Sequence, residues 1–175
     1  MSKVAATMQI ASAVANLSKC NKAKVGAIIV DQDNRIISTG YNGTPIGTCN
    51  ECEDENGKTK PEVIHAECNA ILFANRSLKG CTLYVTLSPC TSCAPLILQC
   101  GISKVIYKDE YRCTKGIDYL RKYGVEVVQL CDLQIEKSTF DQWVDNIHLD
   151  ENHRPDNTMP TFVVPKGFMD ILKNI

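Results

Sequence analysis

The segment Val25-Gly-Ala-Ile-Ile-Val30 is a near-continuous apolar run, and it decides the fold class. Such a run is typical of a strand that is buried on both faces of a sheet. The turn-forming sequence Asp31-Gln-Asp-Asn34 follows it, and Arg35-Ile-Ile-Ser-Thr39 is predicted to return as a second strand. The sequence therefore predicts a hairpin at the start of a well-buried sheet.

Helical and strand-like segments alternate on both sides of this hairpin. The apolar spacing of Val4, Met8 and Ala11 predicts a helix over about residues 3–18. Three more helices and three more strands are predicted over residues 64–76, 81–87, 88–100, 104–107, 114–123 and 125–130, in the order helix, strand, helix, strand, helix, strand. This alternation indicates an α/β fold in which much of the sheet is parallel.

One helix start is ambiguous. Ser88-Pro89 resembles an N-cap followed by proline at the first helical position. Pro95 would then lie in the helix interior, where proline removes a hydrogen bond and clashes with the preceding turn. The helix is therefore expected either to kink at Pro95 or to begin later than Pro89.

Composition excludes several classes of protein. The 175 residues include 19 Lys+Arg and 20 Asp+Glu, for a net charge of −1, which argues against a nucleic-acid polymer or an anionic membrane as partner. No apolar run approaches the roughly 20 residues of a membrane span. Polar residues interrupt the N-terminal segment, so a helix is favoured over a signal peptide. We expect a cytoplasmic protein with reduced thiols, the host cytoplasm if the source is viral.

Two short motifs supply metal-binding chemistry: His65-Ala-Glu67 and Pro89-Cys-Thr-Ser-Cys93. Two cysteines at CxxC spacing at a helix start can face one ion, and the helix dipole there favours thiolates. His65 supplies a third ligand. Two sulfurs and one nitrogen suit Zn²⁺ and leave a fourth position open for water, as in catalytic sites.

Glu67 distinguishes catalysis from a purely structural role. A carboxylate beside the bound water can accept its proton and pass it on to the substrate, as hydrolysis of an amidine-like C–NH₂ group requires. The alternatives are a redox CxxC pair and a non-catalytic zinc module. A structural site would need a fourth protein ligand and no carboxylate at this spacing.

The HxE…PCxxC arrangement is the signature of zinc nucleobase deaminases. Over roughly residues 4–130 the chain resembles the cytidine deaminase superfamily, and within it the deoxycytidylate (dCMP) deaminases. The stretch Gly40-Tyr-Asn-Gly-Thr-Pro-Ile-Gly47 points to the dCMP branch, and Ile64-His-Ala-Glu-Cys-Asn-Ala-Ile71 is similar to phage versions. The competing hypothesis is an enzyme that deaminates free cytidine or an RNA base.

The resemblance implies a three-layer α/β/α sandwich around a five-stranded mixed sheet. It implies hydrolysis of dCMP to dUMP and ammonia, which feeds thymidylate synthesis. His65, Cys90 and Cys93 are implied as ligands of catalytic zinc, and Glu67 as the proton shuttle. Asn42, Lys22 and Tyr111 are the implied substrate-binding residues, with Lys24 as a competing candidate for the phosphate.

Many members of this family are hexamers that dCTP activates and dTTP inhibits, with Mg²⁺ accompanying the triphosphate. On this resemblance Gly43, Thr44 and Gly47 belong to an allosteric site, although Asn-Gly and Pro-x-Gly also form ordinary tight turns. The zinc-dependent deaminase domain of the CMP/dCMP type is predicted to cover residues 1–130. Residues 131–175 lie outside the resemblance, and we expect this extension to pack on the body or on a neighbouring subunit.

The chain has ten cysteines, of which Cys90 and Cys93 are assigned to the catalytic metal. The resemblance leaves open a second, structural zinc site formed by Cys20, Cys49 and Cys52, for which Glu62 is the nearest fourth ligand. The other five are expected to pack as small apolar residues. They are Cys68, Cys81, Cys100, Cys113 and Cys131.

Overall fold

A computed structural model describes residues 2–132 of the chain. Its five strands are β1 (Gly26–Val30), β2 (Ile36–Tyr41), β3 (Thr82–Leu87), β4 (Lys104–Asp109) and β5 (Glu126–Gln129). They form one sheet in the order β2-β1-β3-β4-β5. Strand β1 is antiparallel to both neighbours, whereas β3, β4 and β5 are parallel, so the predicted mixed sheet is confirmed.

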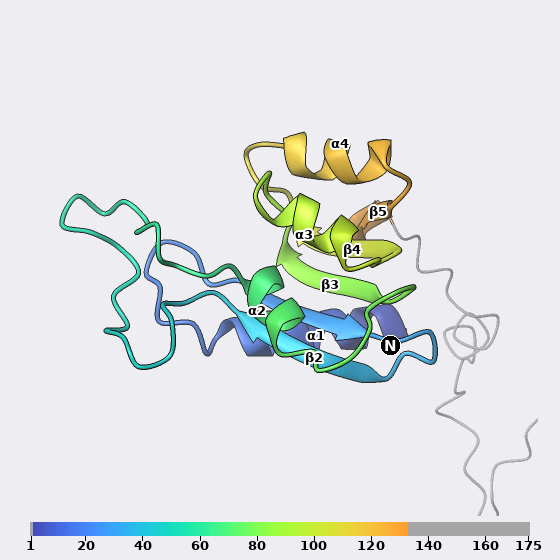
Figure 1. The fold of residues 1–175 in the computed structure, drawn as a ribbon, viewed down its shortest axis with the longest axis horizontal. Coiled ribbons are helices and arrows are strands. Elements are labelled where there is room, and N and C mark those ends of the chain that lie inside the picture. The colour runs from blue at the N-terminus through green and yellow to red at the C-terminus, as the bar shows by residue number, and fades with distance from the viewer. Residues whose placement is uncertain (1, 133–175) are drawn as a thin grey trace, which may run out of the picture. The chain divides into compact units, whose positions relative to one another are not determined.

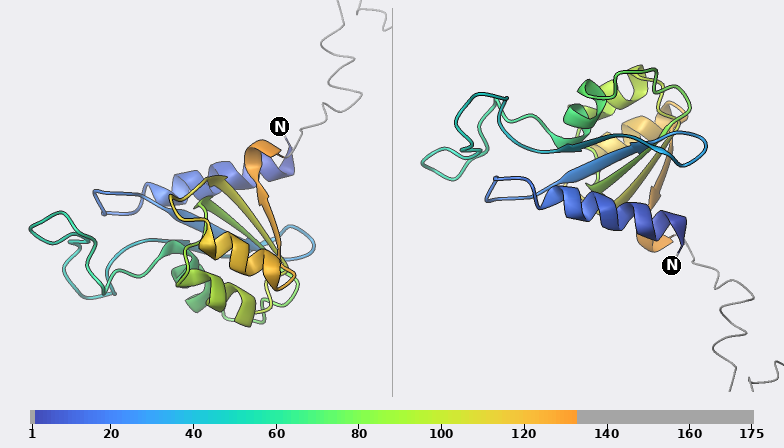
Figure 2. Two further views of the ribbon diagram at one scale, coloured as in Figure 1. Left: turned by 90° about the horizontal axis from the view of Figure 1, so that it is seen from above. Right: turned by 90° about the horizontal axis from the view of Figure 1, so that it is seen from below.

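Helices cover both faces of the sheet. Helix α1 (Lys3–Ala15) lies alone on one face, and α2 (Ala66–Leu72), α3 (Cys93–Gln99) and α4 (Lys115–Lys122) lie on the other (Figures 1 and 2). A short 3₁₀ helix, Leu130–Asp132, follows β5. The three-layer α/β/α sandwich is therefore confirmed. Within residues 2–132, every helix falls short of the length and hydrophobicity that a membrane crossing requires.

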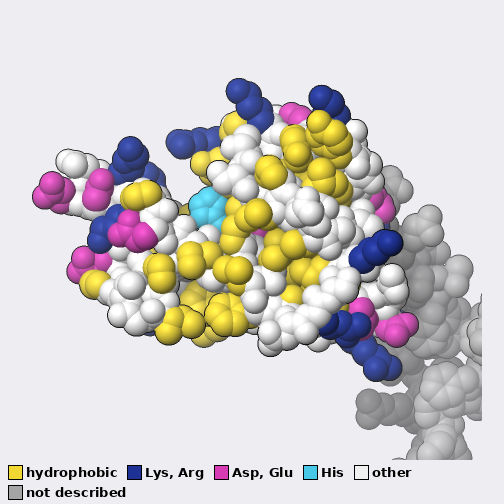
Figure 3. All heavy atoms as spheres, in the orientation of Figure 1, with side chains coloured by type: hydrophobic (Ala, Val, Ile, Leu, Met, Phe, Trp, Pro, Cys, Tyr) yellow, Lys and Arg dark blue, Asp and Glu magenta, His cyan; other side chains and the backbone are white. Residues whose placement is uncertain are grey.

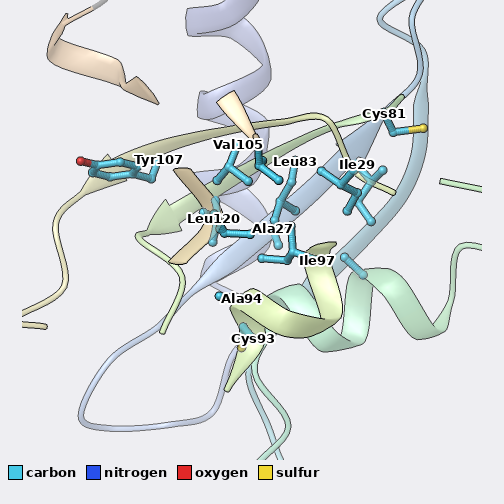
Figure 4. Packing of buried hydrophobic residues seen from close by; sticks show 14 of the residues in the cluster. Ala27, Ile29, Cys81, Leu83, Cys93, Ala94, Ile97, Val105, Tyr107 and Leu120 are labelled. Atoms are coloured by element: carbon cyan, nitrogen blue, oxygen red, sulfur yellow. The ribbon is translucent and has the colours of Figure 1, made fainter. Parts of the chain in front are cut away.

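The side chains of β1 alternate between two apolar clusters, which explains why its sequence is apolar throughout. Ala27 and Ile29 pack with α2, α3 and α4, while Ile28 and Val30 pack with Met8 of α1. Figure 4 shows the first cluster, with Cys93 at the start of α3 against it. A candidate metal ligand is thus itself part of the core.

Helix α3 begins at Cys93, with Ser92 as its N-cap, so the start suggested by Ser88-Pro89 is wrong and the later start is confirmed. Pro95 is then the third helical residue. The N–H at this position has no partner within a helix, so proline there loses no hydrogen bond. Ser88 instead lies buried and accepts a hydrogen bond from the backbone N–H of Tyr111.

A long loop connects β2 to α2 and extends beyond the layered body (Figure 1). Its two ends meet at Gly43 and Ile64, which exchange two backbone hydrogen bonds of 3.1 and 2.8 Å. Gly40 lies against α2 so closely that a Cβ there would collide with backbone atoms of Ala66 and Ala70. These contacts hold the start of α2, and with it His65, against the sheet. Residues 133–175 of the predicted C-terminal extension lie outside the described residues, so its predicted packing stays a prediction.

Candidate functional site

The starts of α2 and α3 bring three metal-binding side chains together. His65 is the N-cap of α2, Cys90 lies in the turn before α3, and Cys93 is the first residue of α3. The Nδ1 atom of His65 lies 3.2 Å from Sγ of Cys93 and 3.4 Å from Sγ of Cys90, and the two sulfurs are 3.7 Å apart. Among residues 2–132, no other histidine, cysteine or carboxylate side chains form such a group of three.

These distances fit one tetrahedral zinc ion. Zinc binds sulfur at about 2.3 Å and nitrogen at about 2.0 Å, so ligand atoms at tetrahedral angles lie about 3.5–3.8 Å apart. The three observed separations, 3.2 to 3.7 Å, are close to these edges. His65 faces both sulfurs through Nδ1, so this nitrogen is the one placed for coordination. The cluster thus supplies three protein ligands, one fewer than a tetrahedral zinc ion takes.

The three side chains also shift one another's pKa. The hydrogen bond with Cys90 raises the pKa of His65 to about 9, although burial opposes the shift. Hydrogen bonds with Cys93 and His65 lower the pKa of Cys90 to about 3 against the effect of burial. The pKa of the Cys93 thiol is raised by its hydrogen bonds with Cys68 and Cys90 and by burial. A cation would have to displace protons from His65 and Cys93.

Glu67 lies in the first turn of α2, and its side chain is only 4% exposed. Burial raises its pKa above the ordinary range of a glutamate, and the nearby His65 only partly offsets this effect. A carboxyl group with a raised pKa exchanges protons more readily near neutral pH. Glu67, His65 and Cys90 line one cavity, so a proton-exchanging group lies beside the metal-binding cluster.

This cavity has a volume of about 270 Å³, near the lower end of the roughly 300–1,000 Å³ of small-molecule sites. The three predicted substrate-binding residues, Lys22, Asn42 and Tyr111, all line it, whereas Lys24 does not. In Figure 3 a histidine is visible in a hollow between the protruding loop and the body. The structure thus brings the predicted metal, acid–base and substrate residues to one cavity.

Asn42 shapes the cavity wall through its amide group. Its Oδ1 atom accepts a 2.8 Å hydrogen bond from the backbone N–H of Val25, and its Nδ2 atom donates one of 2.8 Å to the carbonyl oxygen of Ala23. Val25 and Ala23 both line the cavity. The side chain therefore holds the segment between α1 and β1 in place.

Two cavity-lining charges were not identified from the sequence. The guanidinium of Arg112 lies 5.6 Å from the centre of the Tyr111 ring, so the cation and the phenol share one wall. The position of Arg112 directly after Tyr111 in the sequence could have identified it as a candidate for phosphate binding. Glu53 accepts hydrogen bonds of 3.0 to 3.2 Å from the backbone N–H groups of Asn21 and Lys22. No local signal pointed to Glu53, because more than 30 residues separate it from these partners.

Cys20 and Cys52 are buried and joined by a disulfide bond, with their Cα atoms 5.1 Å apart. The sequence predicted reduced thiols for all cysteines, and the structure differs from this prediction at Cys20 and Cys52. Cys49 is free and exposed. The suggested second zinc site of Cys20, Cys49 and Cys52 is therefore not formed in this structure. The disulfide bond instead joins the segment between α1 and β1 to the protruding loop.

A separate groove of about 580 Å³ contains the three residues predicted to be allosteric, Gly43, Thr44 and Gly47. The Thr44 hydroxyl donates a 2.8 Å hydrogen bond to the carbonyl oxygen of Cys49, which closes the loop locally. Large apolar side chains are exposed along this groove, including Ile46 at 89% and Phe73. Asn42 lines both this groove and the cavity beside the metal-binding cluster.

Comparison with known proteins shows which family the chain belongs to. Residues 1–109 match the family model described as the cytidine and deoxycytidylate deaminase zinc-binding region. A deoxycytidylate deaminase of Enterobacteria phage T4 is 38% identical over 181 aligned positions, covering 77% of this chain and 93% of the relative. A human deoxycytidylate deaminase is 42% identical over 113 positions, covering 59% and 64%.

Among solved structures, the chain is similar to the dCMP deaminase of cyanophage S-TIM5 in complex with dCMP and dUMP. The TM-score is 0.70 at 44% sequence identity, and the match covers 72% of this chain and 95% of that chain.

Proposed function

The chain belongs to the cytidine and deoxycytidylate deaminase family, a family of zinc-binding enzymes, and we propose that its reaction is the hydrolysis of dCMP to dUMP and ammonia. The observation that carries this proposal is the position of Glu67, buried beside the cluster of His65, Cys90 and Cys93 in a cavity whose wall also carries two cations. Two similar proteins, the deoxycytidylate deaminase of phage T4 and the dCMP deaminase of cyanophage S-TIM5, support dCMP as the substrate.

His65, Cys90 and Cys93 would hold the catalytic zinc ion. When bound, zinc lowers the pKa of a coordinated water from 15.7 to about 7 and so supplies a nucleophile at neutral pH. The cluster presents these ligands on two helix starts, where free backbone N–H groups stabilise thiolates. Cys93 is packed in the core and Cys90 lines the cavity, so these two residues would hold the ion between the core and the cavity that would receive the substrate.

Glu67 would move the protons. It accepts one from the attacking water and delivers it to the ring nitrogen next to the amino-bearing carbon of cytosine. Once the water oxygen has bonded to that carbon, Glu67 would take the remaining proton of this oxygen and deliver it to the amino nitrogen. The C–N bond then breaks, the C=O bond forms and ammonia leaves. Its burial matters because a raised pKa makes both acceptance and donation accessible near neutral pH.

Lys22, Tyr111 and Arg112 would bind the 5′-phosphate. They line the same cavity as Glu67, and two of them are cations, which a phosphate dianion requires. This local charge differs from the broad basic surface that an RNA substrate would need, and the chain as a whole has a net charge of −1. The phosphate site thus favours a nucleotide over a nucleoside or a polymer.

The deciding experiment is an ammonia-release assay on dCMP, CMP, deoxycytidine and dCTP with the zinc-loaded protein. We expect dCMP to have the highest kcat/KM, with deoxycytidine weakened by loss of the phosphate contacts. If deoxycytidine reacts and dCMP does not, the monophosphate assignment is wrong. If none of the four releases ammonia, the proposed reaction itself is wrong.

We further propose that dCTP activates and dTTP inhibits this enzyme as a hexamer, with Mg²⁺ accompanying the triphosphate. The groove containing Gly43, Thr44 and Gly47 would receive the effector, and the exposed apolar side chains beside it support self-association. The dUMP product would feed thymidylate synthesis. Assays with each triphosphate, with and without Mg²⁺, combined with light scattering, test this regulation; unchanged activity and a monomeric mass would contradict it.

A further inference from the structure

A fourth sulfur lies next to the metal-binding cluster. Cys68 follows Glu67 in helix α2, and its Sγ atom is 3.8 Å from Sγ of Cys93. We propose that the Cys68 thiol donates a hydrogen bond to the Cys93 thiolate and acts as a positioning residue for zinc. This inference rests on the proposed zinc ligands and concerns the metal site, independently of the substrate.

The chemistry of zinc coordination gives this contact a direction. The geometry alone permits either sulfur to be the donor. A cysteine bound to zinc is a thiolate and has no proton to give. Cys68 is then the only one of the pair that carries an S–H group, so it must be the donor.

Cys68 is placed to act through Cys93 and not as a ligand itself. The three atoms that can share one ion, all within 4.8 Å of one another, come from His65, Cys90 and Cys93, and Cys68 does not belong to this group. Cys68 is half-buried and packs against the apolar cluster between the sheet and helices α2 to α4. Its thiol is therefore held beside Cys93 by the same packing that fixes both helices.

The hydrogen bond has two expected effects. It withdraws negative charge from the Cys93 sulfur, which leaves the ion a stronger Lewis acid. It also connects α2, which carries His65, to α3, which carries Cys93, and so fixes the ligands relative to each other. Hydrogen-bond partners of metal ligands typically change metal affinity or activity by about 10–100-fold when they are removed.

The test compares full-length Cys68→Ala and Cys68→Ser variants in metal binding. Zinc affinity is measured by competition with a chelator, and the sulfur-to-metal charge-transfer absorption is recorded after substitution with Co²⁺. We expect Cys68→Ala to bind zinc at least tenfold more weakly and to shift the Co²⁺ band, with its intensity retained. Cys68→Ser keeps an O–H donor, so it should bind zinc more tightly than Cys68→Ala does.

Cys100→Ala is the matched control, because Cys100 is another half-buried cysteine against the same cluster. It should leave both readouts unchanged. The proposal is overturned if Cys68→Ala matches the parent protein, if the Ala and Ser variants lose affinity equally, or if the band loses the intensity of one thiolate ligand. Metal binding is measured without substrate, so a failure to deaminate dCMP would refute the proposed function and leave this inference standing.

Discussion

The backbone N–H of Tyr111 donates a 2.8 Å hydrogen bond to the hydroxyl oxygen of Ser88. Ser88 is buried and lies two residues before the candidate ligand Cys90, while Tyr111 and Arg112 line the proposed phosphate end of the cavity. A single side chain therefore connects the turn that carries a candidate metal ligand to the loop that carries the proposed phosphate-binding residues.

Replacing Ser88 by alanine should weaken substrate binding. The Tyr111 N–H would lose its partner, at a cost of about 1–3 kcal/mol, and the loop would shift. We expect KM for dCMP to rise severalfold or more, with zinc content unchanged. Steady-state kinetics and metal analysis check this. Ser38→Ala is the control, because Ser38 is also buried but bonds to Ala70 at the far end of α2; an equal rise in KM there would contradict the prediction.

Replacing Glu67 by glutamine should remove proton transfer and keep the metal. Glutamine has nearly the same shape but cannot accept a proton, so turnover should fall at least 10²-fold, the lower end for a positioned acid–base group. Zinc content, measured by metal analysis, should stay at the parent level. Glu62→Gln, an exposed glutamate outside the cavity, should have parent activity. Substantial residual activity in Glu67→Gln would remove this residue from the mechanism.

Arg112→Gln and Lys22→Gln should each raise KM for dCMP by about tenfold or more, since hydrogen bonds to charged groups contribute about 1.5–3 kcal/mol. Their kinetics with deoxycytidine should hardly change, because that substrate has no phosphate. Lys24→Gln is the matched control, since Lys24 lies in the same segment as Lys22 but does not line the cavity. An effect of Lys24→Gln on dCMP alone would transfer the phosphate role to Lys24.

Zinc affinity should fall as the pH is lowered. Interaction with Cys90 raises the pKa of His65 to about 9, so below that pH the imidazole carries a proton that zinc must displace. Each displaced proton weakens binding about tenfold per pH unit. Cys90, with a pKa of about 3, should contribute no such loss at neutral pH. Chelator competition at several pH values between 6 and 9 measures the slope; a flat profile would contradict the prediction.

Gly116→Ala should disturb the metal-binding cluster through helix α4, which packs against the turn that carries Cys90. Gly116 of α4 packs against the backbone of Pro89 and Cys90 so closely that a Cβ would collide with their carbonyl groups. We expect a loss of about 1–3 kcal/mol in the free energy of unfolding, together with weaker zinc binding. Gly43→Ala is the control, because a Cβ there meets no atom within 4 Å. Equal denaturation midpoints for the two variants would show that α4 has room to move.

The sequence predicted those features that depend on local pattern. The apolar run at β1 was sufficient for a buried strand, because each of its side chains enters one of two clusters. The spacing of Cys90 and Cys93 around a helix start, with His65 before another, was sufficient for a metal site, because helix geometry fixes such positions. For the helix that carries Cys93, the structure differs from the simplest pattern in one respect: α3 begins at Cys93, after the turn, and not at Pro89.

Features that depend on distant pairing were not predictable in this way. Ser88 matches the pattern of a helix cap, but its hydroxyl accepts from Tyr111, and only the fold brings that partner near. Cys20 and Cys52 pair across 32 residues of sequence, and spacing alone does not identify such a pair. Arg112 became a candidate only when the cavity showed which side chains share its wall.

The reciprocal backbone bridge between Gly43 and Ile64 has a consequence for how this enzyme can vary. It joins the groove directly to the residue before His65, and it uses only main-chain atoms. Side chains in the loop can therefore change while the backbone connection to His65 persists. Proline at either position lacks an N–H, so it would remove one of the two bonds and weaken the connection between the groove and His65.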